Sequence, residues 1–568
     1  MLIYTDVFEK WDKYIEIENN GQNMQTFLKK ILYLEKHVKF MINIEDFSKK
    51  EDFNWAKDIL EKHDQNKNAL MLMDENEHVS YITYNESLEM ARKYANFLND
   101  EGIKKGDTIL ILTKLIPDLW YISISSSYSG IIYSPTPVLL SKSDLRYRIM
   151  ETKAEAIFTD SDSLDLVSQS VKGIYIKIYD VTDENFKNKL ALENDDYNDI
   201  NNDPHSDQVI FFTSGTEGLP KLIVHDGYYP IGHFSTVSWL NIDENDLHWN
   251  ISSPGWAKWA WSSFYAPFNV GATVFAFDQK RFSAERALKA LENYPITSIC
   301  APPTVWRMFL IQNLDNFKPM ALKKASSAGE PLNPEIIIKW EKITGIKIRD
   351  GYGQTETTAM VGNIDTEKIK PGSAGKSLLQ YEIKIVDENG NVLPFNTEGH
   401  IAIKINNKIP GIFKGYKNDE KLNEERFKNG FYFTGDLGKM DEDGDIWFVS
   451  RADDVIKASD YRISPFEVES ALLMHPAVAE SAVVASPDPI RGNLVKAYVV
   501  LKPGYLPDEK LARELSFHVK EITAPYKRPK KIEFVNELPK TTSGKIIRKE
   551  LRKRELENLK KDNEFYIP

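Results

Sequence analysis

A short segment rich in glycine and hydroxyl groups follows the apolar run Val209–Phe212 and ends in lysine. The segment Thr213–Lys221 reads Thr-Ser-Gly-Thr-Glu-Gly-Leu-Pro-Lys. Glycines let backbone N–H groups approach a ligand, hydroxyls add donors, and the lysine adds a positive charge, so the set suits a polyphosphate. A Walker A loop needs glycine directly before the lysine, and this chain has Pro220 there. The segment therefore predicts a phosphate-binding loop of another kind.

A second cluster, Arg349–Glu356, reads Arg-Asp-Gly-Tyr-Gly-Gln-Thr-Glu and follows Ile346–Ile348, which we predict to be a strand. Tyr352 offers an aromatic face that could stack on a base. Thr355 and Glu356 offer a hydroxyl and a carboxylate, and oxygen atoms of this kind are the ligands that Mg²⁺ prefers. The cluster is consistent with a site for a nucleotide and its metal ion.

Four further segments carry groups that could act in such a site. Ser327–Pro331 predicts a tight loop. Taken alone, such a loop more often has a structural role than a ligand-binding one. Tyr432–Asp436 and Ser450–Asp454 place an acid and an arginine around a predicted pair of strands. Pro539–Arg548 places Lys545 in a Gly/Ser/Thr loop before a basic helix, where a lone lysine would normally be a solvated surface charge.

The elements that must position these groups follow a regular order. Short apolar runs alternate with helical patterns over the first two thirds of the chain, which predicts βαβ units and largely parallel sheet. After about Pro371, short strands separated by Asn-Gly, Glu-Gly and Asp-Gly turns predict an antiparallel unit. We therefore predict an α/β protein with a large N-terminal domain at residues 1–452, built from two α/β layers plus a small β-barrel-like unit. A small mobile α+β domain at 453–568 is predicted to follow. The buried strands expected include Thr108–Leu112, Ala156–Thr159, Thr273–Phe277 and Ser298–Ala301.

Composition and charge exclude several classes of protein. The 568 residues have a net charge of −12, which argues against a protein that coats nucleic acid. From Lys520 onward, however, 14 Lys/Arg minus 8 Asp/Glu gives +6, so a basic end follows an acidic body. Cys300 is the only cysteine, which excludes an intrachain disulfide and multi-cysteine metal sites, and we expect it to be structural. A chain with a single cysteine is more typical of the cytosol than of an oxidising compartment.

No membrane span or targeting segment is predicted. The longest uncharged stretch, Leu119–Ser141, contains seven serines and two prolines, so it predicts a buried helix and a strand rather than a span. The first residues are acidic and lack the apolar core of a signal peptide. Cytoplasmic localisation is the resulting prediction.

In their order and spacing, the four motifs at Thr213–Lys221, Arg349–Glu356, Tyr432–Asp454 and Pro539–Arg548 resemble the adenylate-forming (ANL) superfamily of acyl-CoA synthetases, adenylation domains and luciferases. The resemblance extends from about Phe53 to about Lys553. Four more segments resemble its medium-chain acyl-CoA synthetase branch: Ser253–Trp261, Tyr461–Glu469, Asp488–Gly492 and Thr523–Lys527. The resemblance implies that a carboxylate attacks the α-phosphorus of MgATP, giving acyl-AMP and pyrophosphate, and that the thiol of CoA then displaces AMP.

The resemblance also implies which residues hold the nucleotide. The β- and γ-phosphates would be held by Thr213, Ser214, Gly215, Thr216, Glu217, Gly218 and Lys221. The adenine would be framed by Gly329, Glu330, Pro331, Asp350, Gly351 and Tyr352. Thr355 and Glu356 would lie at the α-phosphate, with Glu356 on Mg²⁺. Gln354, Asp436, Arg451 and Arg462 belong to the same set, Asp436 and Arg451 at the ribose hydroxyls.

The C-terminal domain would supply the moving parts. Lys545 matches the lysine that reaches the substrate carboxylate and α-phosphate during adenylation, and Asp453 matches the hinge. The residues at CoA-contacting positions are Ser459, Tyr461, Arg491, Lys520 and Arg528. This part of the chain departs from the pattern: Asp460 replaces the usual glycine, Arg528 stands where tyrosine is common, and a glutamine expected near Leu139 is absent.

The acyl pocket would be lined by Trp256, Ala257, Trp261, Ala328 and Gly353. Acetate-specific relatives carry a bulky tryptophan directly before the Gln-Thr-Glu run, whereas this chain has Gly353, so we expect an open pocket floor. The acid would then be longer than acetate and of short to medium chain, and whether it is straight, branched, aromatic or hydroxylated stays open. Lys258 could face a polar group at the far end of the acid, although a structural role is the more common one for such a residue.

Two alternatives remain. The chain could be an acyl-AMP ligase that loads a carrier protein instead of CoA, although Arg491 and Lys520 favour CoA. A non-catalytic protein on the same scaffold would be expected to lack Glu356, Asp436 or Lys545, and all three are present. The expected partners are thus a carboxylic acid, ATP and CoA, and the sequence leaves open whether the chain forms a homo-oligomer.

Overall fold

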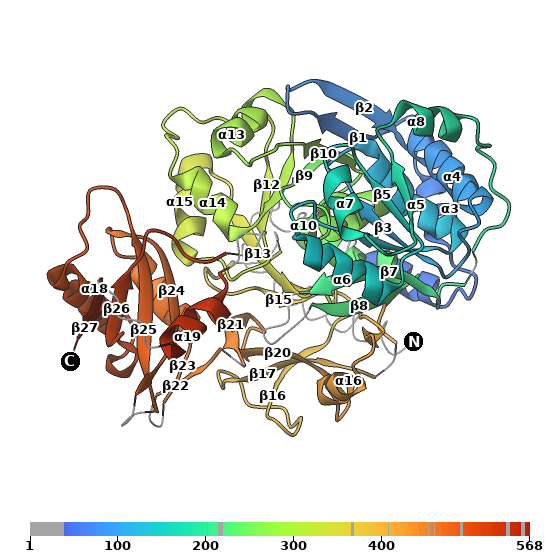
Figure 1. The fold of residues 1–568 in the computed structure, drawn as a ribbon. Coiled ribbons are helices and arrows are strands. Elements are labelled where there is room, and N and C mark those ends of the chain that lie inside the picture. The colour runs from blue at the N-terminus through green and yellow to red at the C-terminus, as the bar shows by residue number, and fades with distance from the viewer. Residues whose placement is uncertain are drawn as a thin grey trace, which may run out of the picture.

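The structure is a computed structural model that describes residues 39–201, 203–213, 220–364, 369–406, 408–452, 454–458, 461–488, 492–540, 546–557 and 563–567. Two helix-covered sheets and an antiparallel unit form a large body, and a smaller unit lies to one side of it, beside β20 and β21 (Figure 1). This arrangement confirms the predicted fold class. None of the helices within these residues combines the length and apolar character that a membrane span requires.

The first sheet has seven strands in the order β18-β8-β7-β4-β3-β5-β6. Its centre is parallel, because β3 pairs in parallel with β4 and β5, and every residue of β3 is buried. Two strands, β3 and β5, have the predicted bounds. The seven strands are β3 (Thr108–Leu112), β4 (Ile132–Pro135), β5 (Ala156–Thr159), β6 (Lys177–Asp180), β7 (Asp207–Thr213), β8 (Lys221–Asp226) and β18 (Gly415–Tyr416).

Helices cover this sheet and link its strands. The helix α4 begins with a capping box in which Thr83 and Glu86 exchange hydrogen bonds, and α5 ends at Gly130, which adopts a left-handed φ of 72°. The helices of this part are α3 (Trp55–Asp58), α4 (Tyr84–Asp100), α5 (Pro117–Ser129), α6 (Lys142–Thr152), α7 (Leu164–Ser170) and α8 (Glu184–Ala191).

The second sheet has nine strands in the order β15-β14-β13-β12-β11-β9-β10-β1-β2. The six strands from β13 to β1 run parallel, and the outer strands run antiparallel. The nine strands are β1 (Asn68–Met73), β2 (Val79–Thr83), β9 (Leu247–Asn250), β10 (Thr273–Phe277), β11 (Ser298–Ala301), β12 (Lys324–Ser327), β13 (Ile348–Gly353), β14 (Ala359–Gly362) and β15 (Lys376–Ser377).

The two faces of this sheet meet different helices. One face packs on α13 (Ala284–Asn293), α14 (Pro303–Leu310) and α15 (Pro334–Thr344) through one apolar core. The other face meets α10 (Phe234–Leu240), which is buried over its whole length and contacts β12, β13 and β14. The short turns α9 (Tyr229–Gly232), α11 (Ala257–Ala260), η2 (Trp261–Tyr265) and α12 (Ala266–Asn269) belong to the same layer.

The strand β13 differs from its prediction. We expected a strand at Ile346–Ile348, directly before the Arg349–Glu356 cluster. The strand instead begins at Ile348 and runs to Gly353, because these residues pair with β12 on one side and β14 on the other. Half of the chemical motif is therefore held rigidly inside the sheet.

The antiparallel unit follows, in the place predicted for a β-barrel-like unit. It is a five-stranded sheet in which β20 pairs with β17, β19 and β21. Its elements are β16 (Ile383–Val386), β17 (Gly399–Lys404), α16 (Glu420–Arg426), β19 (Phe427–Lys428), β20 (Phe431–Met440) and β21 (Ile446–Arg451).

The C-terminal unit has a hydrophobic core of its own around Val483, Ala497 and Leu515. It touches the body where Phe466 meets Phe448 at a ring-centroid distance of 6.2 Å. Its elements are β22 (Ile456–Ala458), β23 (Tyr461–Ile463), α17 (Pro465–Leu473), β24 (Val478–Asp488), β25 (Gly492–Leu501), α18 (Glu509–Ile522), β26 (Lys531–Phe534), α19 (Arg548–Leu556) and β27 (Glu564–Tyr566).

Candidate active site

The strand β13 presents different side chains to its two sides, since successive residues of a strand point in opposite directions. Gly351 and Gly353 face one side, where an indole ring lies against each. A β-carbon added to Gly351 would lie 2.3 Å from Trp239, and one added to Gly353 would lie 2.6 Å from Trp261. Both glycines are therefore required for the tryptophans to lie directly on the strand. Tyr352 points the other way.

On the Tyr352 side, three predicted residues converge on the carboxylate of a fourth. Asp436 of β20 is buried and accepts hydrogen bonds from the Tyr352 hydroxyl and from Gln354 Nε2, the latter at 2.7 Å. Arg451 Nε lies 3.4 Å from Asp436 Oδ1, since Asp436 and Arg451 are register partners on β20 and β21. The predicted pairing of an acid and an arginine around two strands is confirmed.

The predicted phosphate loop joins two antiparallel strands. Thr213 ends β7 and Lys221 begins β8, and the two are register partners, while residues 214–219 lie outside the described part of the chain. Lys221 Nζ lies 5.3 Å from the centroid of the Tyr416 ring, and the Tyr416 hydroxyl donates to Glu356 Oε1 at 2.8 Å. The structure thus brings the lysine of one motif to the glutamate of another.

The Glu356 carboxyl is buried, and this burial raises its pKa although the Tyr416 hydrogen bond acts in the opposite direction. The contact through Tyr416 was not predicted. Tyr416 belongs to β18, which is only two residues long and pairs with β8, and no motif or spacing in the sequence points to it.

The turn that holds Thr355 is fixed by a buried histidine. His225 Nε2 donates to the Thr355 carbonyl at 2.7 Å, and burial lowers the pKa of His225 to about 3, so the ring is neutral. The His225 ring stacks on Tyr229 at 3.7 Å, and the Tyr229 hydroxyl accepts from Trp261 Nε1 at 3.0 Å. Contacts of His225 and Tyr229 therefore connect the turn at Thr355 to Trp261, the tryptophan that lies on Gly353. Sequence reasoning missed His225, because a lone histidine in an apolar strand is rarely distinctive.

The predicted adenine loop is anchored by Asp350. Its carboxyl accepts from Leu332 N at 3.3 Å and from Gly351 N at 3.0 Å, and burial raises its pKa to about 7. Gly329 has a φ of 108°, a conformation that favours glycine, and Glu330 lies 3.9 Å from Arg307. Gly329, Glu330 and Pro331 thus form a defined loop at the end of β12, as predicted.

Of the five residues predicted to line the acyl pocket, Gly353 lies on β13 and Trp261 lies against it. Trp256 and Ala257 lead into the short turns that carry Trp261, and Ala328 is buried at the end of β12. The space beside Gly353 is filled, because a β-carbon there would also lie 2.3 Å from the Thr358 carbonyl oxygen in addition to its contact with Trp261. The open floor expected at Gly353 stays a prediction; the Trp261 ring of η2 lies directly against this glycine.

The residues predicted to contact CoA are only partly described. Tyr461 is half exposed and stacks on Tyr526 at 4.3 Å, and Lys520 is exposed on α18. Arg528 is buried, with its guanidinium 4.9 Å from the Phe517 ring centroid and its Nη2 3.4 Å from the Ile567 carbonyl oxygen. Other predicted residues lie outside the described ranges: Asp453, Ser459, Asp460, Arg491, Lys545 and the loop residues Ser214, Gly215, Thr216, Glu217 and Gly218; the Arg462 side chain is likewise not described.

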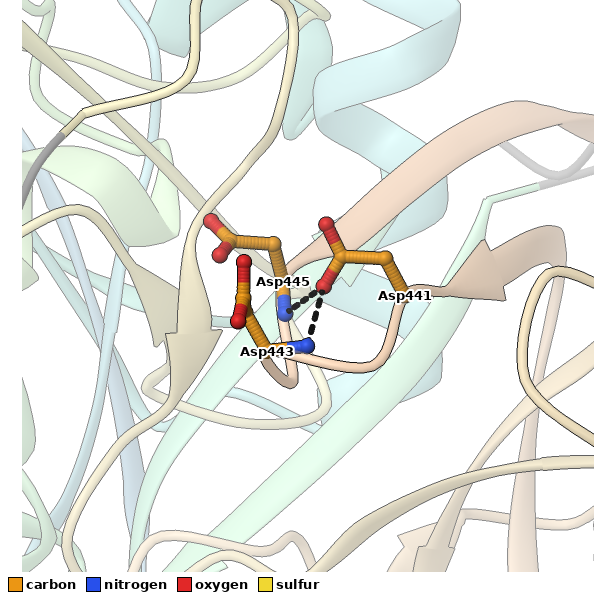
Figure 2. Close-up of side chains that lie close together, drawn as sticks. All are labelled: Asp441, Asp443 and Asp445. Atoms are coloured by element: carbon orange, nitrogen blue, oxygen red, sulfur yellow. Dashed lines mark hydrogen bonds between the residues drawn. The ribbon is translucent and has the colours of Figure 1, made fainter.

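Two clusters of acidic side chains outside the candidate site each include a lysine as an ion-pair partner. Figure 2 shows Asp441, Asp443 and Asp445 in the turn between β20 and β21, where the Asp441 side chain accepts from the two other backbone amides. Lys370 Nζ lies 2.6 Å from Asp441, 2.5 Å from Asp443 and 3.3 Å from Asp445. In the C-terminal unit, buried Lys496 pairs in the same way with Glu533, Glu555 and Glu564. A lysine thus balances part of each cluster's charge.

Known proteins resemble this chain in sequence and in fold. Residues 60–417 match the AMP-binding enzyme family, and residues 467–545 match the AMP-binding enzyme C-terminal domain. The 4-hydroxybutyrate–CoA ligase 1 of Metallosphaera sedula is 42% identical over 99% of this chain and 98% of its own length. Human mitochondrial acyl-coenzyme A synthetase ACSM3 is 40% identical over 89% of this chain and 90% of its own. The crystal structure of a benzoate CoA ligase from Burkholderia xenovorans LB400 is 27% identical with a TM-score of 0.78, covering 88% of this chain and all of its own.

The fold and the site thus define an enzyme that activates a carboxylic acid with ATP. The chain belongs to the family of AMP-binding enzymes. Within that family it is an AMP-forming acyl-CoA synthetase, an acid–thiol ligase that uses an acid, ATP and CoA.

Proposed function

We propose that the enzyme activates a short carboxylic acid with a hydroxyl group at its far end, with 4-hydroxybutyrate as the first candidate, and transfers it to CoA. The observation that carries this proposal is the packing of Trp261 on Gly353, which places an indole ring where a longer acyl chain would extend. Each additional methylene that finds no space forfeits about 0.8 kcal/mol of burial. The ligase of Metallosphaera sedula that resembles this chain over nearly its whole length acts on an acid of this kind.

In the first half-reaction, the site's groups would hold ATP and balance the charge that develops at the α-phosphorus. The Tyr352–Asp436–Arg451 network supports binding of the ribose and adenine on one side of β13. Lys221 and the loop before it would meet the β- and γ-phosphates, and a carboxylate oxygen of the acid would displace pyrophosphate. Positioning and electrostatic stabilisation are the main contributions that a protein makes to phosphoryl-group chemistry.

Glu356 is the residue best suited to hold Mg²⁺, assisted by the hydroxyl of Thr355. The carboxyl lies in the same group of side chains as Lys221, which is the lysine expected at the phosphates, and an oxygen ligand suits this hard cation. When bound, Mg²⁺ neutralises charge on the phosphate oxygens. The protein's own part is to keep Glu356 oriented through the hydroxyl of Tyr416.

In the second half-reaction, the C-terminal unit would change its position, so that the CoA thiol reaches the carbonyl carbon of acyl-AMP and AMP leaves. Lys545 would act in the first half-reaction only. Its described neighbour Arg548 interacts electrostatically with Glu330 of the predicted adenine loop, which supports a place near the nucleotide. Asp453 is the proposed hinge, and Ser459, Tyr461, Arg491, Lys520 and Arg528 are the proposed CoA contacts.

A substrate survey tests the acid. Pyrophosphate release and acyl-CoA formation would be measured with ATP, CoA and acids from two to ten carbons, including hydroxylated and aromatic ones. We expect the highest kcat/KM with four-carbon acids. A preference for acids of eight or more carbons, or for aromatic acids, would show that the assignment of a short acid is wrong. Formation of thioester with free CoA separates the enzyme from one that loads a carrier protein.

A further inference from the structure

One face of the nine-stranded sheet carries polar side chains in an otherwise apolar body. On β9, β11 and β12, alternate residues enter the core against α13–α15: Trp249, Ile299 and Ala325. The residues between them point to the opposite face and are polar or weakly polar. In register across the three strands these are Asn250, Cys300 and Ser326, with His248 and Ser298 one step earlier.

Several polar atoms on this face lack a hydrogen-bond partner among the residues that the structure describes, although all are buried. They are Asn250 Oδ1, Ser326 Oγ, His248 Nε2 and, from α11 directly above, Lys258 Nζ. A buried polar group without a partner costs about 1–3 kcal/mol, and a charged one costs more. A lysine ammonium group with no oxygen or nitrogen acceptor is therefore a position at which a bound molecule would supply one.

The orientation of the Asn250 amide is fixed by its other contacts. Its Nδ2 donates to the Lys258 carbonyl oxygen at 3.3 Å and to Ser263 Oγ at 2.9 Å. A carbonyl oxygen can only accept, so the nitrogen must face it and Oδ1 must point away. The free atom of Asn250 is thus an acceptor, whereas the free group of Lys258 is a donor.

Lys258 and Asn250 both lie next to Cys300. The Lys258 ammonium interacts with the Cys300 thiol, and Asn250 is the register partner of Cys300. Sulfur is a weak acceptor and does not satisfy an ammonium group. The carboxyls of Asp350 and Glu330 also act on the charge of Lys258. These residues adjoin the proposed acyl pocket, because Lys258 stands between Ala257 and Trp261.

We propose that Lys258 and Asn250 form the far end of the acyl pocket and select acids that carry a hydroxyl there, with Lys258 Nζ donating to the hydroxyl oxygen and Asn250 Oδ1 accepting its proton. This assignment rests on the proposed function, since it needs the acid to enter between Trp261 and Ala328. It names the residues that distinguish a hydroxy acid from the plain acid of the same length.

A hydroxyl at the far end of the acid fits Lys258 and Asn250 better than a methyl group or a second carboxylate does. A methyl group would leave both the ammonium and the amide oxygen unpaired. A second carboxylate would accept from Lys258, but it has no proton for Asn250 Oδ1 and would add a negative charge beside Glu330. Of the three ends compared, only the hydroxyl donates and accepts at once. Sites that bind a substrate hydroxyl in this way discriminate strongly against analogues without it.

The test compares 4-hydroxybutyrate with butyrate and succinate, using kcat/KM for acyl-CoA formation by the full-length wild-type enzyme and by Lys258→Met. We expect the wild type to favour 4-hydroxybutyrate over butyrate, and the ratio of the two kcat/KM values to fall about 10- to 100-fold in Lys258→Met, as loss of a charged hydrogen bond implies. The exposed Lys323→Met serves as the control and should keep the wild-type ratio.

A second variant, Asn250→Leu, keeps the assignment testable if Lys258→Met does not fold, and it should lower the same ratio. The assignment would be overturned by a ratio near one in the wild type, or by a ratio in both variants equal to that of the wild type. A preference for succinate would also overturn it. If none of the three acids is activated while another acid in the survey is, the proposed short acid is itself wrong. Butyrate turnover without discrimination would overturn only the roles of Lys258 and Asn250.

Discussion

The two sides of strand β13 contrast in how their polar groups are satisfied. On the Tyr352 side, the Asp436 carboxylate already has Tyr352, Gln354 and Arg451 as partners. On the side of Gly351 and Gly353, Lys258 Nζ and Asn250 Oδ1 lack partners among the described residues. The proposed nucleotide side is thus organised by the protein's own hydrogen bonds, whereas the proposed acyl side has polar groups that the acid would complete. The difference suits an enzyme whose nucleotide is constant and whose acid varies between relatives.

We expect the largest effect on activity from a substitution on the Tyr352 side of β13. Asp436→Ala removes the acceptor that three side chains share, and hydrogen bonds to charged groups are each worth about 1.5–3 kcal/mol. We expect kcat/KM for ATP to fall by about 10²- to 10³-fold, measured by pyrophosphate release at saturating acid. Asp443→Ala, on the exposed turn after the same strand, is the matched control and should change kcat/KM little. A loss confined to the KM of the acid would contradict the division into two sides.

Asp350 should make stability depend on pH. Burial raises its pKa from 3.8 to about 7, so the folded state holds a proton that the unfolded state has released over that range. Stability contributed by this group is therefore present at low pH and is lost as pH rises from about 4 to about 7. Between pH 5 and pH 8 the wild type should lose about 3 kcal/mol relative to Asp350→Asn. Urea unfolding at the two pH values measures this, and parallel curves for both proteins would refute it.

The preferred chain length of the acid should depend on the size of the side chain at position 261. Trp261→Ala removes the indole that lies on Gly353 and opens space for about two methylenes, worth about 1.6 kcal/mol. We expect the ratio of kcat/KM for hexanoate over butyrate to rise about 15-fold, with the KM for ATP nearly constant. Gly353→Ala is the informative companion, because its β-carbon would collide with Trp261 and the Thr358 carbonyl oxygen. It should reduce activity with every acid instead of changing chain-length preference.

The smallest effect should come from the hydroxyl of Tyr416. This group donates to Glu356 and lowers the pKa of a carboxyl that burial raises. In Tyr416→Phe the pKa of Glu356 should rise further, so the acidic limb of the profile of kcat/KM for ATP against pH should move to higher pH. The rate at high pH should change much less. An unshifted limb would show that Tyr416 does not control Glu356.

The sequence predicted best where local pattern and tertiary environment agree. Thr108–Leu112 and Ser298–Ala301 form strands with the predicted bounds because a short apolar run between helical segments suits a buried parallel strand. The convergence of Asp436 and Arg451 followed from two strands joined by an Asp-Gly turn. The strand β13 was predicted to end at Ile348 because the glycines that follow disfavour a strand, and its pairing with β12 and β14 overrides that preference.

Other parts of the site depend on contacts between distant segments. Tyr416 reaches Glu356 through a two-residue strand, and Trp261 reaches Gly353 from a separate layer, so spacing along the chain contained no information about either contact. The polar face beneath Lys258 could have been found, because His248–Asn250 and Ser298–Cys300 each place polar or weakly polar side chains on either side of a buried apolar one. Alternation of this kind in a central strand indicates a polar interior surface.

The single strand β13 separates the proposed sites for ATP and the acid. Successive residues of this strand face the two sites alternately. A displacement of β13 that improves the fit of Trp261 also moves Tyr352 and hence the three partners of Asp436. The affinities for the two ligands are therefore thermodynamically coupled, and by reciprocity each should change the dissociation constant of the other by the same factor. Titration calorimetry with a non-hydrolysable ATP analogue, with and without the acid, would measure that factor as a synergy between the substrates.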